Sequence, residues 1–379
     1  MDFALSSDQE MIRDTAEAFL AEASSSAAVR AAMQTETGFD DALWARIGQE
    51  LGWCATVIPE VYDGLGLGSV ELVLLMEQMG RRLLCAPFFS TVGLAAQVLL
   101  EVADDAAKLR YLPHIAAGEL TATVALASSG IDWQAQNIDA TVSIDTDGFV
   151  ISGNYAHVPD GATAQLLIVP AHDSNGGVGL YAFPAELSGI TRTPYRNVDT
   201  TRRIAAIQLD QVRLPKDALI ATPQQVTHAM PRAVALAMLV LAAEQLGGAQ
   251  QCLDLTLAYT AERVQFGRTI ASFQAIKHRC AEMMVRIEAT RSAIYGAATV
   301  AANPALAADF LLEAAGAKAL ASDTFFHCAG EAIQLHGGVG FTWEYDPQLY
   351  FKRAQAGTHW LGSADTLRER IATALLGPA

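Results

Sequence analysis

The sequence contains few basic residues, and this shortage limits the partners that we expect. Its 379 residues include 25 Lys and Arg against 41 Asp and Glu, which gives a formal net charge of −16 at pH 7. Nucleic acids and anionic membranes attract basic protein surfaces. We therefore expect neither nucleic acid nor a membrane as a partner, and an anionic ligand would need a locally basic site.

Cysteine is also scarce, and its five copies follow no pairing pattern. Their number is odd, and none is spaced as CxxC (Cys54, Cys85, Cys252, Cys280 and Cys328). Disulfide frameworks and zinc sites are recognised by regular cysteine spacings. We therefore expect reduced thiols in the core of a cytoplasmic protein, and no metal site.

Signals for export or membrane insertion are missing as well. Residues 1–6 contain neither the basic segment nor the apolar segment of a signal peptide, so we expect none. An apolar run over residues 233–243 is interrupted by Glu244. It is shorter than the roughly 20 residues that span a bilayer.

Hydrophobic residues make up 51% of the chain, and their spacing divides it into three parts. Residues 1–117 and 221–379 have helical spacing, with long runs over 231–262, 273–302 and 304–328. Between them lie short alternating or β-branched segments separated by turn residues (121–126, 140–144, 149–151, 165–169, 179–183 and 205–209). The pattern predicts an α+β protein with an N-terminal helical domain over 1–117, a middle β-barrel or sandwich domain over 118–220, and a C-terminal helical domain over 221–379.

Two motifs in the last part combine groups that can hold a phosphate. The first reads Arg-Val-Gln-Phe-Gly-Arg at residues 263–268 and continues with Phe-Gln-Ala at 273–275. A guanidinium can hold a pyrophosphate by two parallel hydrogen bonds, and a glycine lets backbone N–H groups approach the same anion. Taken alone, this motif is equally typical of a solvated helix end. The second motif reads Gln-Leu-His-Gly-Gly-Val-Gly-Phe at residues 334–341.

Together the two motifs resemble those of the acyl-CoA dehydrogenases, which are FAD flavoproteins. Residues 58–67 resemble the family's Pro-Glu-x-x-Gly-Gly-x-Gly loop, with Asp63 in place of the first paired glycine. Residues 210–215 resemble the exit from its β domain. The likeness covers essentially the whole chain, and it implies that the C-terminal domain is a four-helix bundle.

The resemblance also implies a cofactor, a substrate and an electron acceptor. In the family the two motifs hold the adenosine-pyrophosphate half of an FAD that is bound mainly by a neighbouring subunit. The residues implied to contact this FAD are Arg263, Phe266, Phe273, Gln274, Gln334, Gly337 and Gly338. An acyl-CoA thioester is the implied substrate, and an electron-transfer flavoprotein or a similar protein is the implied acceptor. We expect His336 to be a structural turn residue, and Lys277 and His278 to lie on a solvated helix face.

The catalytic base of the family is missing at both places where its members carry it. That base is a glutamate, which removes the α-proton of the thioester while a hydride leaves the β-carbon. An ungapped count places Leu361 at the usual position and Ala237 at the alternative one. Neither side chain can accept a proton, so we predict no catalytic residue in this chain.

The carboxylate nearest to the alternative position is Glu244. It lies two helical turns after Ala237 on about the same face. Burial could raise its pKa and make it a base. A glutamate in an interhelical ion pair is the more common arrangement, and it is the one that we expect.

The segments that would contact the flavin ring also depart from the family. Its Thr-Glu-Pro…Gly-Ser-Asp loop is replaced by Ala-Leu-Ala-Ser-Ser-Gly-Ile-Asp-Trp at residues 125–133. Its Trp-Ile-Thr-Asn-Gly element is replaced by His-Val-Pro-Asp-Gly at 157–161. Pro159 has neither a hydroxyl nor an N–H to offer a flavin. The chain thus keeps what a subunit gives to its neighbour's FAD and lacks what it would use for its own.

This asymmetry resembles the non-catalytic member of a heteromeric acyl-CoA dehydrogenase, known from bacterial breakdown of steroid side chains. The first hypothesis is an FAD-sharing subunit of an α2β2 heterotetramer, with the base on a homologous partner. The second is a self-sufficient homotetrameric dehydrogenase that uses Glu244 as its base. The third is a catalytically inactive scaffold that binds CoA or acyl groups.

Overall fold

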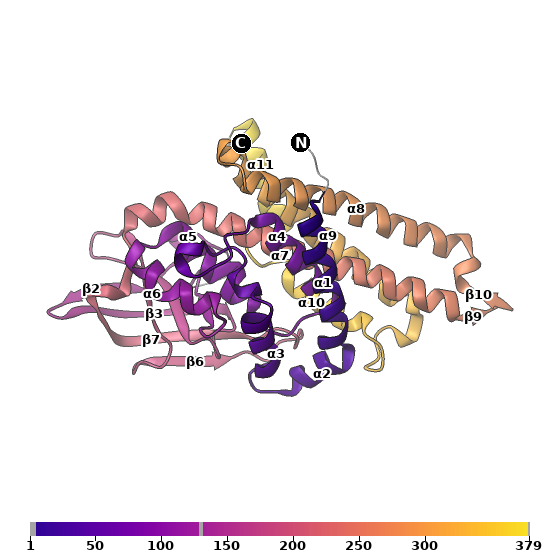
Figure 1. The fold of residues 1–379 in the computed structure, drawn as a ribbon, viewed down its shortest axis with the longest axis horizontal. Helices are drawn as coiled ribbons and strands as arrows, with labels where there is room; N and C mark the ends of the chain where they lie inside the picture. Colours follow the sequence, from indigo (N-terminus) through magenta and orange to yellow (C-terminus); the bar gives the residue numbers. More distant parts are fainter. Residues whose placement is uncertain (1–4, 129–131, 378–379) are drawn as a thin grey trace. The chain divides into compact units, whose positions relative to one another are not determined.

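The structure, a computed structural model, describes residues 5–128 and 132–377. Along the sequence, a block of strands lies between a first and a second group of helices, and Figure 1 colours these elements in chain order. This order confirms the predicted fold class, with helical, β-sheet and helical parts in succession. The predicted domain limits at 117/118 and 220/221 remain predictions, although the type of element changes close to both.

The first part of the chain consists of short helices. Helix α1 begins with a capping box, in which the Ser6 hydroxyl accepts the Gln9 N–H at 3.2 Å and the Gln9 side chain accepts the Ser6 N–H at 3.0 Å. The α-helices of this part are α1 (Ser7–Ala23), α2 (Ser26–Gln34), α3 (Asp41–Ala45), α4 (Ser69–Arg81), α5 (Ala96–Val102) and α6 (Asp105–Ala116).

The middle strands form one eight-stranded sheet. Its order is β6-β7-β3-β2-β4-β5-β8, and β1 pairs in parallel with β4. The strands are β1 (Ala122–Val124), β2 (Thr141–Asp145), β3 (Gly148–Pro159), β4 (Leu166–His172), β5 (Val178–Pro184), β6 (Ile190–Pro194), β7 (Ile204–Pro215) and β8 (Leu219–Ala221). Alternate residues of these strands, such as Ile151, Tyr155 and Phe183, are buried in a hydrophobic core on the sheet.

The predicted strands are confirmed in place, but two strands of this sheet, β6 and β8, were missed. Strand β6 carries mostly exposed or half-exposed residues and lies at the edge of the sheet, so its sequence shows no alternation of apolar and polar residues. Strand β8 is only three residues long. Strands β3 and β7 are each twelve residues long, which exceeds the prediction.

Long helices and a small hairpin make up the last part. The elements are α7 (Pro223–Glu262), β9 (Val264–Gln265), β10 (Arg268–Thr269), α8 (Gln274–Ala301), α9 (Ala307–His336), α10 (Pro347–Gly357) and α11 (Ala364–Leu376). Helix α7 starts eight residues before the predicted start, and Pro231 lies inside it. Helix α9 continues past residue 328 to the second motif.

Helix α7 is long and apolar enough to cross a membrane, judged by length and composition within the described residues. Of its most apolar window, 72% is buried inside the protein. A helix that is apolar on all sides is typical of a protein core as well as of a membrane.

By its contacts, the chain divides into two compact units. Unit 1 contains the residues up to Ala31, Ser69–Leu84 and the residues from Met238 onward. Unit 2 contains Ala32–Gly68 and Cys85–Ala237, and therefore the whole eight-stranded sheet. Both motifs and Leu361 belong to unit 1, whereas residues 157–161 belong to unit 2.

Candidate functional site

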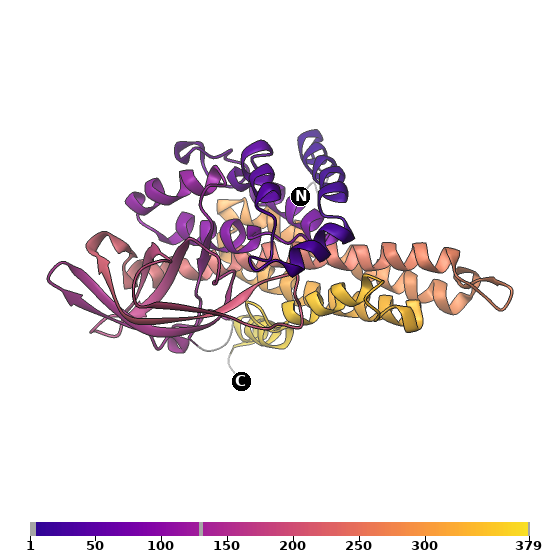
Figure 2. The same cartoon turned by 90° about the horizontal axis from the view of Figure 1, so that it is seen from below.

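The first motif forms a tight hairpin at the end of helix α7, where α7 and α8 meet (Figures 1 and 2). Gln265 pairs with Arg268, so the loop has only two residues, Phe266 and Gly267. Both have positive φ, 52° and 77°. Two-residue hairpins with positive φ at both loop positions match the twist of the strands and favour glycine. The predicted helix break at Gly267 is confirmed, and it has the form of a hairpin.

Phe266 is the unusual residue of this hairpin. A bulky side chain at positive φ is an outlier, and strain of this kind costs about 1–3 kcal/mol. Its ring is also 92% exposed, so this chain recovers little by packing. The Phe266 ring lies 6.1 Å from that of Phe273 in an edge-on arrangement, and the Arg268 guanidinium lies 4.0 Å above the Phe273 ring. The hairpin therefore presents aromatic and cationic groups to the outside.

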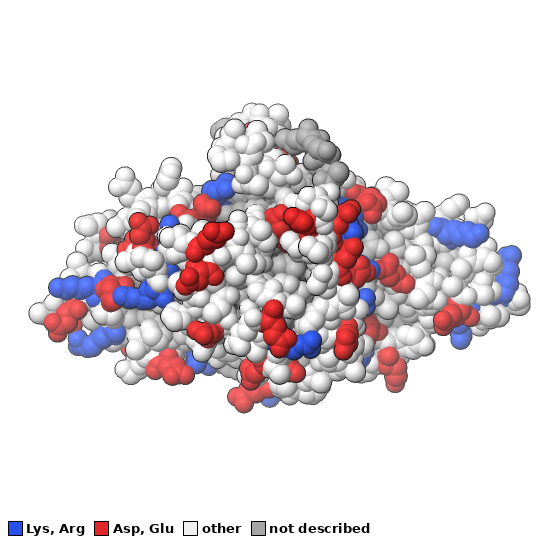
Figure 3. Space-filling model, in the orientation of Figure 1, with Lys and Arg blue, Asp and Glu red and all other residues white. Residues whose placement is uncertain are grey.

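Arg263 and Gln274 flank this hairpin and face solvent. The Arg263 N–H donates to Tyr259 O at 2.9 Å, and its carbonyl accepts the Ile270 N–H at 2.8 Å. The backbone is thus fixed, while no residue in the described part of the chain offers the Arg263 guanidinium a hydrogen bond or an ion pair. Figure 3 shows acidic side chains spread over this face, and basic side chains both at the end where the hairpin lies and at the opposite end of the view.

The second motif ends helix α9 in an open glycine turn. Gly337 has φ 65° and ψ −144°, a conformation available to glycine but strained for other residues. A Cβ placed on Gly337 or Gly338 would meet no atom within 4 Å. Both glycines and the preceding Gln334 are exposed. Since no described residue requires Gly338 to lack a side chain, the turn leaves room for a group from outside.

A stack of rings joins the two motifs within unit 1. The His336 ring lies 4.4 Å from that of Tyr259 and 6.1 Å from that of Tyr345. Its Nδ1 is 2.7 Å from Ala332 O, and burial lowers the pKa of His336. Tyr259 lies one turn before Arg263, and His336 directly precedes Gly337. The structure therefore brings the ends of α7 and α9 together, and His336 has the structural contacts that we expected.

The segment expected to carry the base follows helix α10. Leu361 is 1% exposed with φ 59°, and its side chain cannot accept a proton. The fully buried Lys318 holds the segment, since its Nζ donates to Thr358 O at 3.0 Å, to Gly362 O at 2.7 Å and more weakly to Gly357 O at 3.4 Å. Gly357 O also accepts the Gln245 side-chain N–H at 3.1 Å. The segment is thus fixed by buried hydrogen bonds.

Glu244 is buried in helix α7 and faces a cation. Its Oε1 lies 3.6 Å from Nε of Arg353 on α10, and both side chains are less than a tenth exposed. Helices α4 and α7 approach closely beside it, since a Cβ on Gly80 would come within 1.9 Å of Glu244 O. The geometry favours the interhelical ion pair over the catalytic role. Ala237, which the count along the chain puts at the alternative position of the base, is fully buried.

Residues 157–161 stand where other family members carry a flavin-ring contact, and in this chain they contact other residues of unit 2. His157 has φ 54° at a bulge of strand β3, and its ring stacks on Tyr195 at 5.3 Å. Pro159 O accepts the hydroxyl of Thr123 at 2.6 Å, and Asp160 accepts that of Ser90 at 2.6 Å. Of the other segment, residues 129–131 lie outside the described residues. No group of three or more His, Cys, Asp or Glu that could hold a metal occurs in the described parts of the chain.

Comparison with known proteins shows the family. Residues 6–119 match the acyl-CoA dehydrogenase N-terminal domain, and residues 228–376 match the acyl-CoA dehydrogenase C-terminal domain. The acyl-CoA dehydrogenase IpdE2 of Mycobacterium tuberculosis is 33% identical over 96% of this chain and 96% of its own length. IpdE2 of Mycolicibacterium smegmatis is 32% identical over 94% and 96%. The chain belongs to the acyl-CoA dehydrogenase family.

Solved structures of similar proteins include heteromeric assemblies and flavin complexes. A chain of the steroid acyl-CoA dehydrogenase Tcur3481-Tcur3483 superposes with a TM-score of 0.84 at 27% identity over 97% of both chains. A chain of the ChsE4-ChsE5 complex of Mycobacterium tuberculosis superposes with a TM-score of 0.88 at 23% identity, covering both chains fully. An acyl-CoA dehydrogenase of Bacillus anthracis solved with FAD has a TM-score of 0.90 at 22% identity, over 98% of this chain and 67% of that one. Members of the family are therefore FAD-bound oxidoreductases, some of which occur in complexes.

Three residues of this acyl-CoA dehydrogenase were not singled out from the sequence. Arg268 covers the Phe273 ring, Arg353 pairs with Glu244, and Lys318 holds the segment around Leu361. A lysine in the Ala-rich stretch of residues 314–321 was a visible signal, because lysine in the middle of an apolar helix is unusual. The role of Arg353 had no comparable signal.

Proposed function

We propose that this chain is an FAD-sharing subunit of an acyl-CoA dehydrogenase complex and that a homologous partner supplies the catalytic base. The observation that carries the proposal is a contrast between two sets of residues in this chain. The surface of unit 1 that would face a neighbour's FAD is open, whereas a count along the chain puts Leu361 and Ala237, which cannot accept a proton, at both positions of the base.

The exposed residues of the two motifs fit the adenosine-pyrophosphate half of FAD. Arg263 offers a guanidinium without a partner in the described residues, and the turn at Gly337 and Gly338 offers backbone without side chains. The aromatic rings of Phe266 and Phe273 and the amides of Gln274 and Gln334 would complete this contact. Bound FAD would supply the acceptor for the hydride of the acyl thioester.

The role of this chain in the reaction is then to bind FAD, and the partner removes the α-proton. Glu244 is buried, and its Oε1 lies 3.6 Å from Nε of Arg353, so its carboxylate is held in an ion pair between α7 and α10. We infer that Glu244 stabilises the packing of α10 on α7.

The similar proteins suggest the substrate class, the assembly and the electron acceptor. We infer a CoA thioester from lipid or steroid degradation as substrate, an α2β2 heterotetramer as assembly, and an electron-transfer flavoprotein or similar acceptor for the electrons. The similar steroid dehydrogenase and the two IpdE2 relatives support this inference. Reduced cysteines, all five of them buried and free, agree with a cytoplasmic location.

A count of flavin per chain tests the proposal. The chain should be produced alone and together with candidate homologous partners, and FAD should be measured by absorbance after purification. We expect little FAD with the chain alone and about one FAD per pair of unlike chains in the complex. One FAD per chain in the isolated protein would contradict the proposal and favour a homotetramer, while no FAD in either preparation would favour a scaffold.

A further inference from the structure

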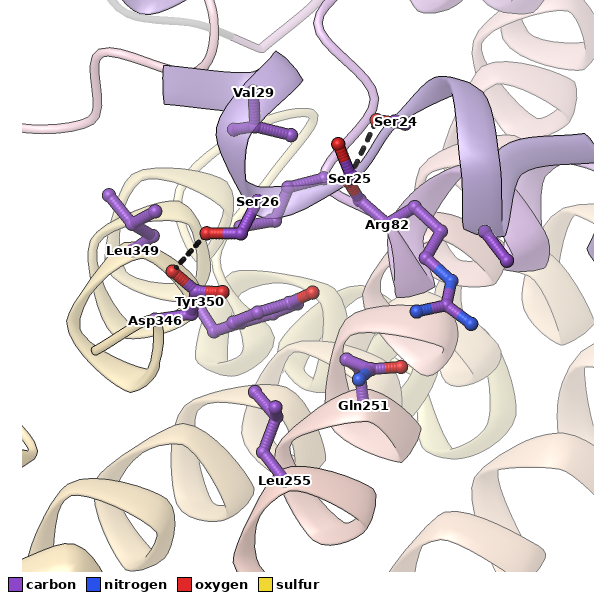
Figure 4. A pocket seen from close by; sticks show the side chains of 12 residues that line it. Ser24, Ser25, Ser26, Val29, Arg82, Gln251, Leu255, Asp346, Leu349 and Tyr350 are labelled. Atoms are coloured by element: carbon purple, nitrogen blue, oxygen red, sulfur yellow. Dashed lines mark hydrogen bonds between the residues drawn. The ribbon is translucent and has the colours of Figure 1, made fainter. Parts of the chain in front are cut away.

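Unit 1 contains a cavity of about 220 Å³ that none of the seven predicted FAD contacts lines (Figure 4). It lies where the end of α1 and the start of α2 meet the end of α4, the last third of α7 and the start of α10. Every residue that lines it belongs to unit 1. Neither the proposed dehydrogenation nor the FAD contacts give this cavity a role.

The cavity contains a cation without a counter-charge. The Arg82 guanidinium has no hydrogen-bond or ion-pair partner among residues 5–128 and 132–377, and the same holds for the Gln251 side-chain amide. Figure 4 shows both groups on the same side of the cavity. The Arg82 backbone is fixed, because its carbonyl accepts the Ser24 hydroxyl at 3.0 Å. A half-buried guanidinium loses part of its hydration, so an anion beside it would be stabilised.

The acidic residue on the opposite wall of the cavity does not pair with Arg82. The Asp346 carboxylate also lines the cavity, but it is taken by Arg30 at 2.6 Å and by the Ser26 hydroxyl at 2.7 Å. Arg82 is therefore the uncompensated charge of this lining. One guanidinium and one amide match the single charge and the planar head of a carboxylate. A phosphate dianion would bring a second negative charge close to Asp346.

The remaining lining favours a ligand with a short hydrocarbon body. Val29, Leu255 and Leu349 line the cavity from three different helices. Apolar walls with a few converging polar groups are typical of sites for small organic molecules. We propose that the cavity binds a small organic monocarboxylate, with its head on Arg82 and Gln251 and its body against Leu255 and Leu349.

Calorimetric titration of the purified full-length chain with sodium butyrate tests this site, with sodium phosphate and sodium chloride at equal ionic strength for comparison. We expect saturable binding of butyrate and none of the other two salts. Arg82→Gln should weaken butyrate binding about tenfold or more, because it removes a charge-assisted pair of hydrogen bonds. Gln251→Leu should weaken it less.

The control is Arg286→Gln, which removes an exposed arginine of helix α8 that pairs with Glu282 and should leave binding unchanged. Arg82→Gln breaks no hydrogen bond or ion pair of this side chain with a described residue, so the variant should melt at about the wild-type temperature. Absence of saturable butyrate binding, equal binding by Arg82→Gln, or tighter binding of phosphate than of butyrate would overturn the proposal. None of these results depends on FAD, so the proposed function is tested separately.

Discussion

Arg263 is the side chain on which the proposed FAD contact depends most. Arg263→Ala in the assembled complex should weaken FAD binding by about 1.5–3 kcal/mol, the range for hydrogen bonds to charged groups. Arg263→Lys should restore only part of the affinity, because lysine lacks the planar fork. Equilibrium flavin titration of the apo-complex measures both effects. The exposed Arg286 serves as a matched control, and equal affinities for wild type and Arg263→Ala would refute the contact.

A substitution at Gly338 distinguishes an effect on FAD binding from an effect on folding. A Cβ there would meet no atom of residues 5–128 and 132–377 within 4 Å, so Gly338→Val should keep the wild-type melting temperature while FAD binds more weakly. Gly340→Val is the opposite control, because a Cβ there would come within 2.7 Å of Ile333 O and should destabilise the fold. If Gly338→Val retains full flavin affinity, the turn is only a connection between helices.

Lys318 is expected to stabilise the segment around Leu361 through its buried hydrogen bonds. Lys318→Met would leave the carbonyls of Thr358 and Gly362 without this donor, at roughly 1–3 kcal/mol for each unsatisfied group. We expect the urea midpoint of unfolding to fall accordingly, with an unchanged slope. The exposed Lys277 gives a control, since Lys277→Met should stay within about 0.5 kcal/mol of wild type. A midpoint equal to that of wild type would show that the Lys318 contacts contribute nothing.

For single residues, the sequence allows a prediction where a count along the chain from a recognisable motif suffices. The placement of Leu361 and Ala237 at the two positions of the base rests on such a count and stays a prediction. The partner of Glu244 could not be predicted, since only the packing of α10 against α7 brings Arg353 to it. For the same reason the unpaired state of Arg82 is visible only in the folded chain.

Among the structural elements, the β9–β10 hairpin allows two effects of Phe266 to be compared, its backbone strain and its contribution to FAD binding. Asparagine tolerates positive φ better than phenylalanine, so Phe266→Asn should leave the free energy of unfolding unchanged or raise it by about 1 kcal/mol. The same variant should bind FAD more weakly, because it removes an exposed ring. Denaturant unfolding and flavin titration give the two values. Lower stability together with unchanged flavin affinity would contradict this role of the hairpin.

Whole elements could be predicted where the apolar pattern is long and regular. The long helices of the last part follow from their 3.6-residue spacing, and the strands in the sheet centre from their alternation. Strand β6 could not be predicted, because an edge strand with exposed residues carries no such pattern. The start of α7 was placed at Pro231, but a proline can lie inside a helix when the surrounding packing stabilises it.

At the level of the assembled protein, the account predicts that this chain cannot dehydrogenate acyl-CoA alone. Loss of a general base costs roughly 10²–10⁴-fold in rate, and the lost flavin-ring contacts add to that deficit. The negative charge of the chain would also disfavour the anionic CoA outside locally basic sites. A homologous partner with an intact base should restore activity.

Glu244→Gln distinguishes this account from a self-sufficient enzyme. Removing one partner of a buried pair costs about 3–5 kcal/mol, so folding must be followed with activity. The double variant Glu244→Gln/Arg353→Met removes the unpaired cation as well and should regain stability. It provides a folded protein without a carboxylate at this position.

The most direct test is acyl-CoA dehydrogenation, measured with an artificial electron acceptor, for the isolated chain and for the complex with its homologous partner. We expect little or no turnover by the isolated chain and clear turnover by the complex. Glu244→Gln and the double variant should leave the turnover rate per folded complex close to that of wild type. Replacement of the partner's base should abolish it. Robust turnover by the isolated chain that is lost in both Glu244 variants would contradict the account and make this chain an enzyme in its own right.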